Sequence, residues 1–303
     1  MQGFSRGSPH ESFEQKTIDF FCEKRREWRL FFLFMMMTIS IIGAGNMGSA
    51  IAQALLSSQV ILPENLRIAD PSTEKLQFFK NAGCDTSTKA EEIIPRSDIL
   101  LLATKPQVLP ELLESWKDLL GKNTILLSIA AGVSVSTLQQ KSGLLKIVRI
   151  MPNTPAQIGM GVSGVYFSPA VEKEEQIDIN ALLDSFSVVI PCETEEMINA
   201  ITALSGSGPA YVFRILEIFA GKAEEMGFSV SHAQTIALQT LLGAGMLAKK
   251  SGESFGILRE KVTSKGGTTA AALDLFASEK LEEVIKNGID AAFYRAQELS
   301  SGK

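Results

Sequence analysis

The glycine-rich turn at residues 43–48 constrains the fold of this chain more than any other stretch. An apolar run, Ile39–Ile42, precedes it and is typical of a strand buried on both faces of a parallel sheet. A run of helical composition follows from Ser49. The turn itself has the G-x-G-x-x-G spacing, and a strand before it with a helix after it is the context in which this pattern binds a dinucleotide.

Each glycine of the turn has its own expected task. Gly43 permits the tight turn, Gly45 lets a pyrophosphate approach the backbone, and Gly48 lets the helix pack close to the strand. The start of the helix then offers unpaired N–H groups and a partial positive charge to the phosphates. We assign Asn46 and Met47, within the same turn, to this cofactor site. The alternative is a glycine-rich loop without a ligand.

Length and composition favour a two-domain globular protein. The chain has 303 residues, 45% of them hydrophobic, and a net charge of −5, which argues against a nucleic-acid partner. Its three cysteines, Cys22, Cys84 and Cys192, are too far apart for a disulfide framework or a metal site and suit a reducing cytoplasm. With only His10 and His232 present, a histidine-dependent acid–base mechanism is not expected.

Residues 1–36 do not fit the fold that follows them. A basic cluster at 24–26 and an apolar run at 30–34 resemble parts of a signal peptide, but the apolar run continues into the first strand, so that cleavage there would destroy it. The run is also too short for a membrane span. We expect translation to begin at one of Met35 to Met37, the upstream residues being a start-site artefact or a disordered tail. A membrane-surface anchor is the alternative.

Several loops are expected at the carboxyl ends of parallel strands, where open α/β sheets bind ligands. Asp70 ends a second strand and is placed to receive the ribose 2′-OH, or equally to cap the helix that starts after Pro71. Further loops hold the other cofactor candidates: Ala103, Thr104, Lys105, Pro106, Ala130 and Asn153. For Lys105 a solvated loop lysine is the alternative.

The composition changes at Glu195. Before it, the runs predict a sheet of about eight strands; after it, nearly everything is helical, ending in a helix over 270–299 with a break near Ser278. We therefore predict an α/β protein with a tail (1–36), a Rossmann-type dinucleotide-binding domain (37–194) and an all-α substrate and dimerisation domain (195–303). Apolar stripes at helical spacing in the second part indicate a homodimer or a higher homo-oligomer.

From about Thr38 to the end, the chain resembles pyrroline-5-carboxylate reductases. The ordered motifs that carry the resemblance are GAGNMG at 43–48, ATKP at 103–106, SIAAG at 128–132, MPNTP at 151–155, SGSGPAY at 205–211 and TSKGGTT at 263–269. The first is shared by many dehydrogenases, whereas the last two together are specific. One position departs from the family pattern, which has proline where this chain has Lys265.

The resemblance implies reduction of L-Δ1-pyrroline-5-carboxylate to L-proline by NADPH or NADH, the last step of proline biosynthesis. It also implies that Thr269 hydrogen-bonds the ring nitrogen, that Thr268 holds the carboxylate and that Glu195 lies near the substrate. We accordingly expect Thr269 and Glu195 to be catalytic, with Ser264, Gly266 and Gly267 completing the substrate site. Consecutive N–H groups at a helix start suit a carboxylate, although the two threonines could simply cap that helix.

Two other functions stay open at this point. One is a related imine reductase or 3-hydroxyacid dehydrogenase; such hydroxyacid dehydrogenases usually place a lysine where this chain has residues 211–213, Tyr-Val-Phe. The other is a catalytically impaired nucleotide-binding sensor, suggested only by Lys265. We expect a cytoplasmic enzyme that acts on a small molecule, without a metal ion and without a membrane or nucleic-acid partner.

Overall fold

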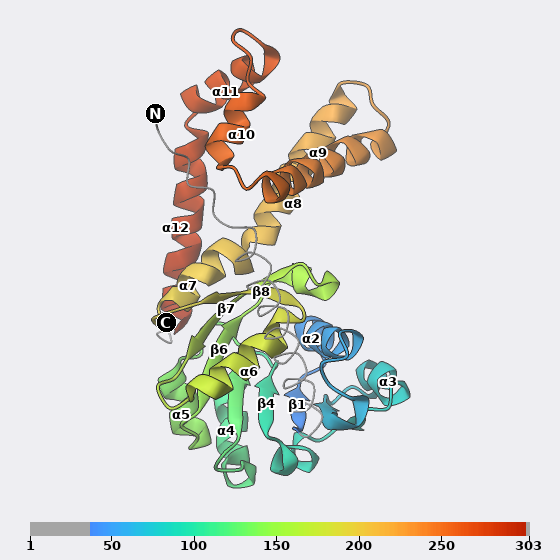
Figure 1. Ribbon diagram of the computed structural model, residues 1–303, viewed down its shortest axis with the longest axis vertical. Helices are drawn as coiled ribbons and strands as arrows, with labels where there is room; N and C mark the ends of the chain where they lie inside the picture. The colour runs from blue at the N-terminus through green and yellow to red at the C-terminus, as the bar shows by residue number, and fades with distance from the viewer. Residues whose placement is uncertain (1–36, 301–303) are drawn as a thin grey trace, which may run out of the picture. The chain divides into compact units, whose positions relative to one another are not determined.

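The computed structural model describes residues 37–300, so the expectations for residues 1–36 lie outside the described residues. The chain forms two compact units (Figure 1). The first reaches Ile198 and also takes in Leu299 near the end of the chain, and the second spans Asn199–Glu298. Among the described residues, no helix has both the length and the apolarity that a membrane span requires.

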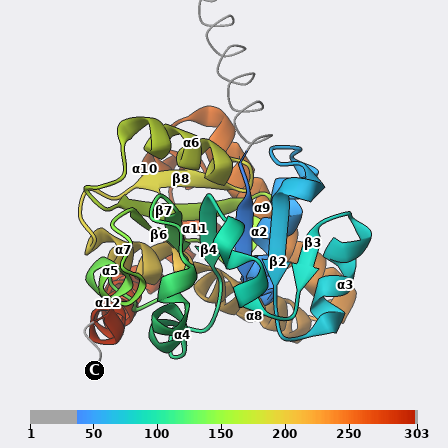
Figure 2. The same cartoon turned by 90° about the horizontal axis from the view of Figure 1, so that it is seen from below.

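The first unit is built on one eight-stranded sheet with the order β3-β2-β1-β4-β5-β6-β7-β8, which confirms the predicted α/β fold (Figure 2). The pairs are parallel except β6 with β7. The strands are β1 (Ile39–Ile42), β2 (Leu66–Ala69), β3 (Asp85–Ser87), β4 (Ile99–Leu102), β5 (Ile125–Ser128), β6 (Ile147–Met151), β7 (Gly161–Phe167) and β8 (Ser187–Pro191).

Helices cover both faces of this sheet because its central strands are apolar on both sides. The α-helices of the first unit are α2 (Asn46–Ser57), α3 (Thr73–Asn81), α4 (Leu109–Trp116), α5 (Val135–Ser142) and α6 (Lys173–Asp184). Short 3-10 helices stand between them: η1 (Pro63–Asn65), η2 (Ala90–Glu92), η3 (Ile94–Arg96), η4 (Lys117–Leu119) and η5 (Thr154–Ile158).

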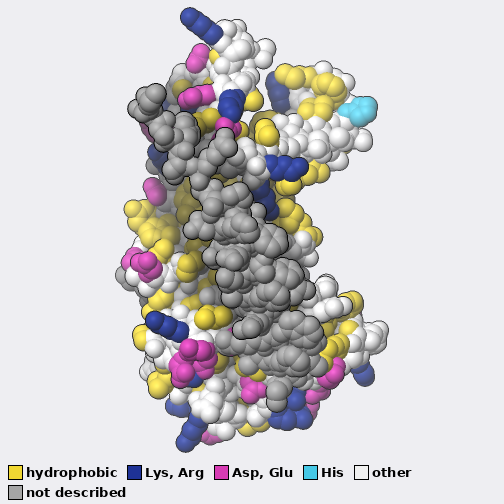
Figure 3. All heavy atoms as spheres, in the orientation of Figure 1, with side chains coloured by type: hydrophobic (Ala, Val, Ile, Leu, Met, Phe, Trp, Pro, Cys, Tyr) yellow, Lys and Arg dark blue, Asp and Glu magenta, His cyan; other side chains and the backbone are white. Residues whose placement is uncertain are grey.

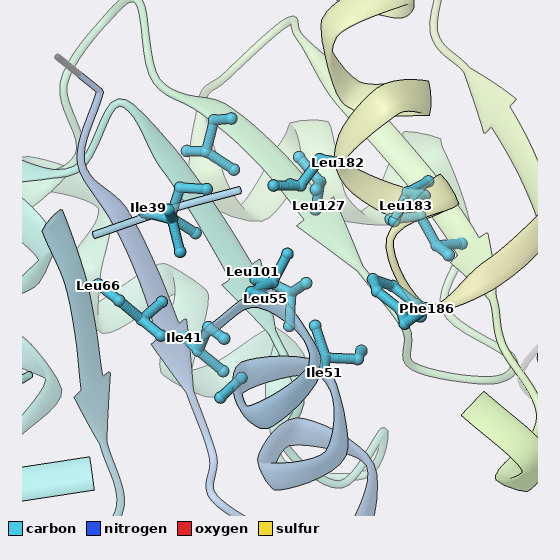
Figure 4. Close-up of a cluster of buried hydrophobic side chains, with 14 of the residues drawn as sticks. Ile39, Ile41, Ile51, Leu55, Leu66, Leu101, Leu127, Leu182, Leu183 and Phe186 are labelled. Carbon is cyan, nitrogen blue, oxygen red and sulfur yellow. The ribbon is translucent and has the colours of Figure 1, made fainter. Parts of the chain in front are cut away.

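Alternate residues of the central strands enter two separate cores. On one face, Ile39 and Ile41 of β1 pack with Ile51 and Leu55 of α2, in a cluster that also includes residues of α3 and α6 (Figure 4). On the other face, the neighbouring strand positions pack with α4 and α5. This two-sided packing holds the carboxyl ends of β1, β2 and β4 at one edge of the sheet.

The second unit is all helical, as predicted, but it buries no large apolar side chain of its own. Its elements are α7 (Met197–Ile201, which starts in the first unit), a π-helical segment (Thr202–Gly206), α8 (Gly208–Glu225), α9 (Val230–Ser251), α10 (Phe255–Lys261), α11 (Thr268–Ser278) and α12 (Leu281–Ser300). Among the described residues 199–298, the buried ones are five alanines and Asn199. Large apolar side chains such as Phe213, Leu238 and Val284 are exposed, and apolar groups reach the surface over these helices in Figure 3.

Candidate functional site

A cavity of about 650 Å³ lies in the first unit at the carboxyl ends of β1, β2, β3 and β4. This is the edge at which ligands bind in open α/β sheets. Six of the predicted cofactor residues line it: Gly43, Gly45, Asp70, Ala103, Thr104 and Lys105. The predicted Asn46, Met47 and Gly48 form the first turn of α2, and Pro106 lies in the loop after β4; these four are not part of the cavity wall.

The glycine turn has the geometry that its spacing predicts. Gly43 adopts a φ of +106°, and a Cβ there would come within 2.7 Å of the Ala103 carbonyl oxygen. A Cβ on Gly48 would lie 2.0 Å from the Gly43 carbonyl oxygen, so only glycine lets α2 pack this close to the turn. A Cβ on Gly45 would meet nothing within 4 Å, so this position leaves open space at the start of α2.

Asp70 holds two loops of the cavity together. Its Oδ2 accepts a hydrogen bond from the Ala44 N–H at 2.8 Å, and its Oδ1 accepts one from the Ser72 N–H at 2.9 Å. The Lys75 ammonium lies 3.6 Å from Oδ2, and the carboxylate is buried. The bond to the Ser72 N–H fixes the turn before α3, but the side chain of Ser72, the N-cap of that helix, makes no capping hydrogen bond. Both tasks considered for Asp70 therefore stay predictions. Ser72 and Lys75, which also line the cavity, are then left to meet a ligand.

The loop after β4 offers a hydroxyl that lacks a partner. Thr104 Oγ1 is buried and makes no hydrogen bond within the described part of the chain. Such a group costs free energy unless something bonds to it, and Thr104 lines the cavity. Together with the open space at Gly45 and the helix start of α2, this hydroxyl fits a bound dinucleotide.

The far wall of the cavity comes from residues that the sequence analysis does not identify. The Trp116 Nε1–H donates to Glu91 Oε1 at 2.9 Å, and both residues line the cavity with Thr88 and Lys89. A hydrogen bond from its own backbone N–H lowers the pKa of Glu91, and the bond from Trp116 lowers it further. The wall thus has an aromatic surface and a carboxylate that stays ionised. No motif marks these positions, since they lie in a short turn and on one face of α4.

Ala130 and Asn153 lie in the loops after β5 and β6 and do not line this cavity. The Ala130 N–H donates to Ser128 Oγ at 3.3 Å, and Asn153 Oδ1 accepts from the Val162 N–H at 2.9 Å. In the structure both residues therefore shape their own loops.

Glu195, predicted to be catalytic, lies in the first unit and bonds to two of its elements. Its Oε1 accepts a hydrogen bond from Arg149 Nη1 at 2.6 Å and another from the Val135 N–H at 2.7 Å. The Arg149 side chain is 4% exposed and that of Glu195 is 30% exposed. This contact joins β6, the start of α5 and the segment that leads into α7.

The predicted substrate residues lie together in the second unit, at the start of α11. The Gly267 N–H donates to the Ser264 carbonyl at 3.0 Å, and Gly266 has a φ of +70°. Gly267 is the N-cap of α11, where no side chain of the described residues caps the helix. Thr268 and Thr269 form its first turn. The helix start thus offers backbone N–H groups and two hydroxyls to an anion.

Models of two protein families match the chain, one in each part. "NADP oxidoreductase coenzyme F420-dependent" matches residues 38–132, and "Pyrroline-5-carboxylate reductase dimerisation" matches residues 195–299.

Relatives and solved structures match over most of the chain. The pyrroline-5-carboxylate reductase of Arabidopsis thaliana is 34% identical over 263 residues, covering 86% of this chain and 95% of that protein. The Haemophilus influenzae enzyme of the same name is 34% identical over 265 residues, with 87% and 97% covered. A Coxiella burnetii pyrroline-5-carboxylate reductase structure, 34% identical, superposes with a TM-score of 0.82 over 87% of this chain and 98% of that one. A Plasmodium falciparum pyrroline carboxylate reductase with NADP bound, 28% identical, gives 0.80 over 88% and 99%.

Proposed function

This chain belongs to the pyrroline-5-carboxylate reductase family, and we propose that it reduces L-Δ1-pyrroline-5-carboxylate to L-proline with NADPH or NADH. The observation that carries the proposal is the extent of the match: relatives of that name, 34% identical, align over about six-sevenths of the chain. The family models match residues 38–132, which contain the glycine turn and the loop after β4, and residues 195–299, which contain the loop before α11. The protein acts in the cytoplasm, as a homodimer or a higher homo-oligomer formed through its helical part.

When bound, NADPH or NADH would supply the hydride that is added to the carbon of the substrate's C=N bond. The protein's task is to bind and orient the two reactants. The turn at Gly43–Gly48 and the start of α2 hold the pyrophosphate, and Thr104 Oγ1 finds its missing partner on the cofactor. A protonated cyclic imine is already electrophilic, so the protein needs no strong acid of its own.

The loop before α11 binds the substrate. The N–H groups at Gly266 and Thr268 hold the carboxylate, and the Thr269 hydroxyl bonds the ring nitrogen. Gly267 and Ser264 close the turn through the bond from the Gly267 N–H to the Ser264 carbonyl. Each of these groups donates or accepts a hydrogen bond without changing its protonation state. This suits a reaction in which the hydride comes from the cofactor.

Both forms of the cofactor are used, with NADPH discrimination weaker than about tenfold. The Asp70 carboxylate repels a 2′-phosphate, but its oxygens are bonded to the Ala44 and Ser72 N–H groups and Lys75 offsets its charge. Ser72 and Lys75 can then hold a phosphate, while a ribose hydroxyl can still bond Asp70. Opposing effects of this kind reduce selectivity between the two cofactors.

An absorbance assay tests the proposed function. When purified protein is mixed with NADPH and pyrroline-5-carboxylate, the absorbance of the reduced nicotinamide should fall. The amount of proline formed should equal the amount of NADPH oxidised. The same assay with 3-hydroxyisobutyrate and NADP⁺, or with other cyclic imines, tests the related dehydrogenases. Cofactor binding without turnover of any substrate would favour a nucleotide-binding sensor instead.

Thr269→Ala tests the substrate site. Removing one hydroxyl that bonds the substrate should lower kcat/KM by an amount worth about 1–3 kcal/mol. Cofactor affinity, followed by nicotinamide fluorescence, should barely change because the hydroxyl does not touch the cofactor. A loss of cofactor affinity as large as the loss in kcat/KM would contradict the assignment.

A further inference from the structure

We infer that Glu195 and Arg149 are a positioning pair for the proposed reduction, and that Glu195 does not deliver a proton to the substrate. One oxygen of the Glu195 carboxylate is shared between two donors. Glu195 Oε1 accepts from both Arg149 Nη1 and the Val135 N–H, at 2.6 and 2.7 Å. Both partners donate to this oxygen, so it acts as an acceptor whose two bonds hold other groups in place.

Because Arg149 is buried, its charge depends on this contact. Arg149 stands in the middle of β6, and its side chain is almost inaccessible to water. A buried guanidinium needs a charged partner, and the only ion pair that it makes within the described residues is with Glu195. Val135 is the first residue of α5, where the N–H groups of the helix start favour a negative charge.

The position of the pair in the chain indicates what it holds. Val135 follows the β5–α5 loop that contains Ala130, and Arg149 precedes the loop that contains Asn153. Both loops lie at the carboxyl edge of the sheet. Glu195 therefore fixes the spacing between the loops after β5 and β6. It also fixes the start of α7, which begins two residues later in the chain.

The end of the chain reaches the same loop. Gly132, in the β5–α5 loop, adopts a φ of +77°, and a Cβ there would lie 3.0 Å from the Leu299 carbonyl oxygen. Glu195, before residue 199, thus attaches to the start of α5, and Leu299, after residue 298, lies beside Gly132 in the loop that leads into the same helix. Since residues 199–298 carry the substrate loop, an error at this attachment is passed on to the substrate.

The inference rests on the proposed function, and a charge-rescue experiment tests it. Glu195→Gln keeps an acceptor for the Val135 N–H but leaves the Arg149 charge unpaired. We expect kcat to fall by about ten- to a hundredfold, while the affinity for adenosine diphosphoribose, which lacks the nicotinamide, changes less than about threefold. Adding Arg149→Met removes the unpaired charge and should recover at least about fivefold of the lost kcat.

The outcomes separate positioning from proton delivery. If Glu195 were the proton donor, the double variant would stay as slow as Glu195→Gln, and both would lose one limb of the pH–rate profile. That result would overturn the inference. Glu193→Gln, at an exposed acid two residues away, is the matched control and should behave as the wild type.

A second variant guards against loss of the fold. Arg149→Lys keeps the buried positive charge but not the planar geometry of the guanidinium, so it should lower kcat by about three- to tenfold with an unchanged pH profile. Wild-type kcat in this variant would also overturn the inference. If the wild type itself did not turn over pyrroline-5-carboxylate, only the proposed function would fail. Faster amide hydrogen exchange over residues 130–138 in Glu195→Gln than in Glu193→Gln would still show that the pair holds this segment in place. Equal exchange in the two variants would contradict the positioning role.

Discussion

Asp70 illustrates how one side chain can serve both the fold and the choice of cofactor. Asp70→Asn removes the charge but keeps one acceptor for the two N–H groups that the carboxylate binds. We expect the ratio of kcat/KM for NADPH to that for NADH to rise about three- to tenfold, because the repulsion of a 2′-phosphate is relieved. The KM for both cofactors should rise, because one loop loses its anchor. Steady-state kinetics with each cofactor measures both effects.

Glu74→Gln is the control for Asp70→Asn. It removes a negative charge from the first turn of α3, four residues after Asp70, at an exposed position. Its cofactor ratio should match that of the wild type. An unchanged ratio in Asp70→Asn as well would mean that Asp70 does not face the adenosine ribose.

Lys265 occupies a turn that proline would suit. The hydrogen bond from the Gly267 N–H to the Ser264 carbonyl, with Gly266 at a φ of +70°, is typical of a type II turn, in which proline is common at the position of Lys265. The Lys265 N–H donates no backbone hydrogen bond within the described residues. Lys265→Pro should therefore raise the free energy of unfolding by about 0.4–1 kcal/mol with little effect on kcat. Denaturant titration measures it, and destabilisation would show that the turn is of another type.

Cys84 makes the free energy of unfolding depend on pH. Burial raises the pKa of the Cys84 thiol from 9.0 to about 11. Below pH 9 the thiol is neutral in both states and has no effect. Between pH 9 and 11 the unfolded chain ionises first, so the free energy of unfolding should fall as the pH rises. Cys84→Ala lacks this effect, so its stability should fall less over the same range in denaturant titrations. Parallel curves would contradict the assigned pKa.

At the scale of whole elements, the sequence predicts the strands better than the connections. Apolar runs bounded by turn residues locate the central strands because these are buried on both faces. The break predicted near Ser278 is found at Glu279 and Lys280, between α11 and α12. Helix α5 is missed, although its signals are present: Ser134 Oγ accepts from the Thr137 N–H, and Gly143 ends the helix at a φ of +76°. The π-helical segment, by contrast, has no comparable signal.

The candidate site divides in the same way. The glycine turn and Asp70 are predictable because local spacing determines their geometry. The Trp116–Glu91 wall and the Arg149–Glu195 pair are not predictable in this way. The first joins residues 25 positions apart and the second residues 46 positions apart, and each contact depends on the packing of the whole sheet. The resemblance places Glu195 near the substrate, and only the structure gives its partners.

For the molecule as a whole, the helical part raises a question of stability. About a hundred residues, 199–298, bury only small side chains among those described, while large apolar ones on α8, α9 and α12 remain exposed. Burial of apolar surface is the main contribution that offsets the entropy lost on folding. A unit that buries so little apolar surface needs another surface against which its exposed apolar side chains can pack. The match of residues 195–299 to a dimerisation family agrees with a second copy of this chain as that surface.

Two substitutions on one helix test this dependence on a partner. Leu238, on α9, is 50% exposed in the single chain, where an aspartate would cost little. In a dimer that covers it, Leu238→Asp buries an unpaired charge and should abolish assembly, with a loss in the melting temperature of about 10 °C or more. Gln239→Asp adds the same charge at the next position and should assemble normally. Light scattering gives the mass of each variant, and the wild-type melting temperature should rise with protein concentration, since association stabilises only the folded chain. A monomeric wild type whose melting temperature is independent of concentration, with Leu238→Asp as stable as Gln239→Asp, would mean that the helical part folds without a partner.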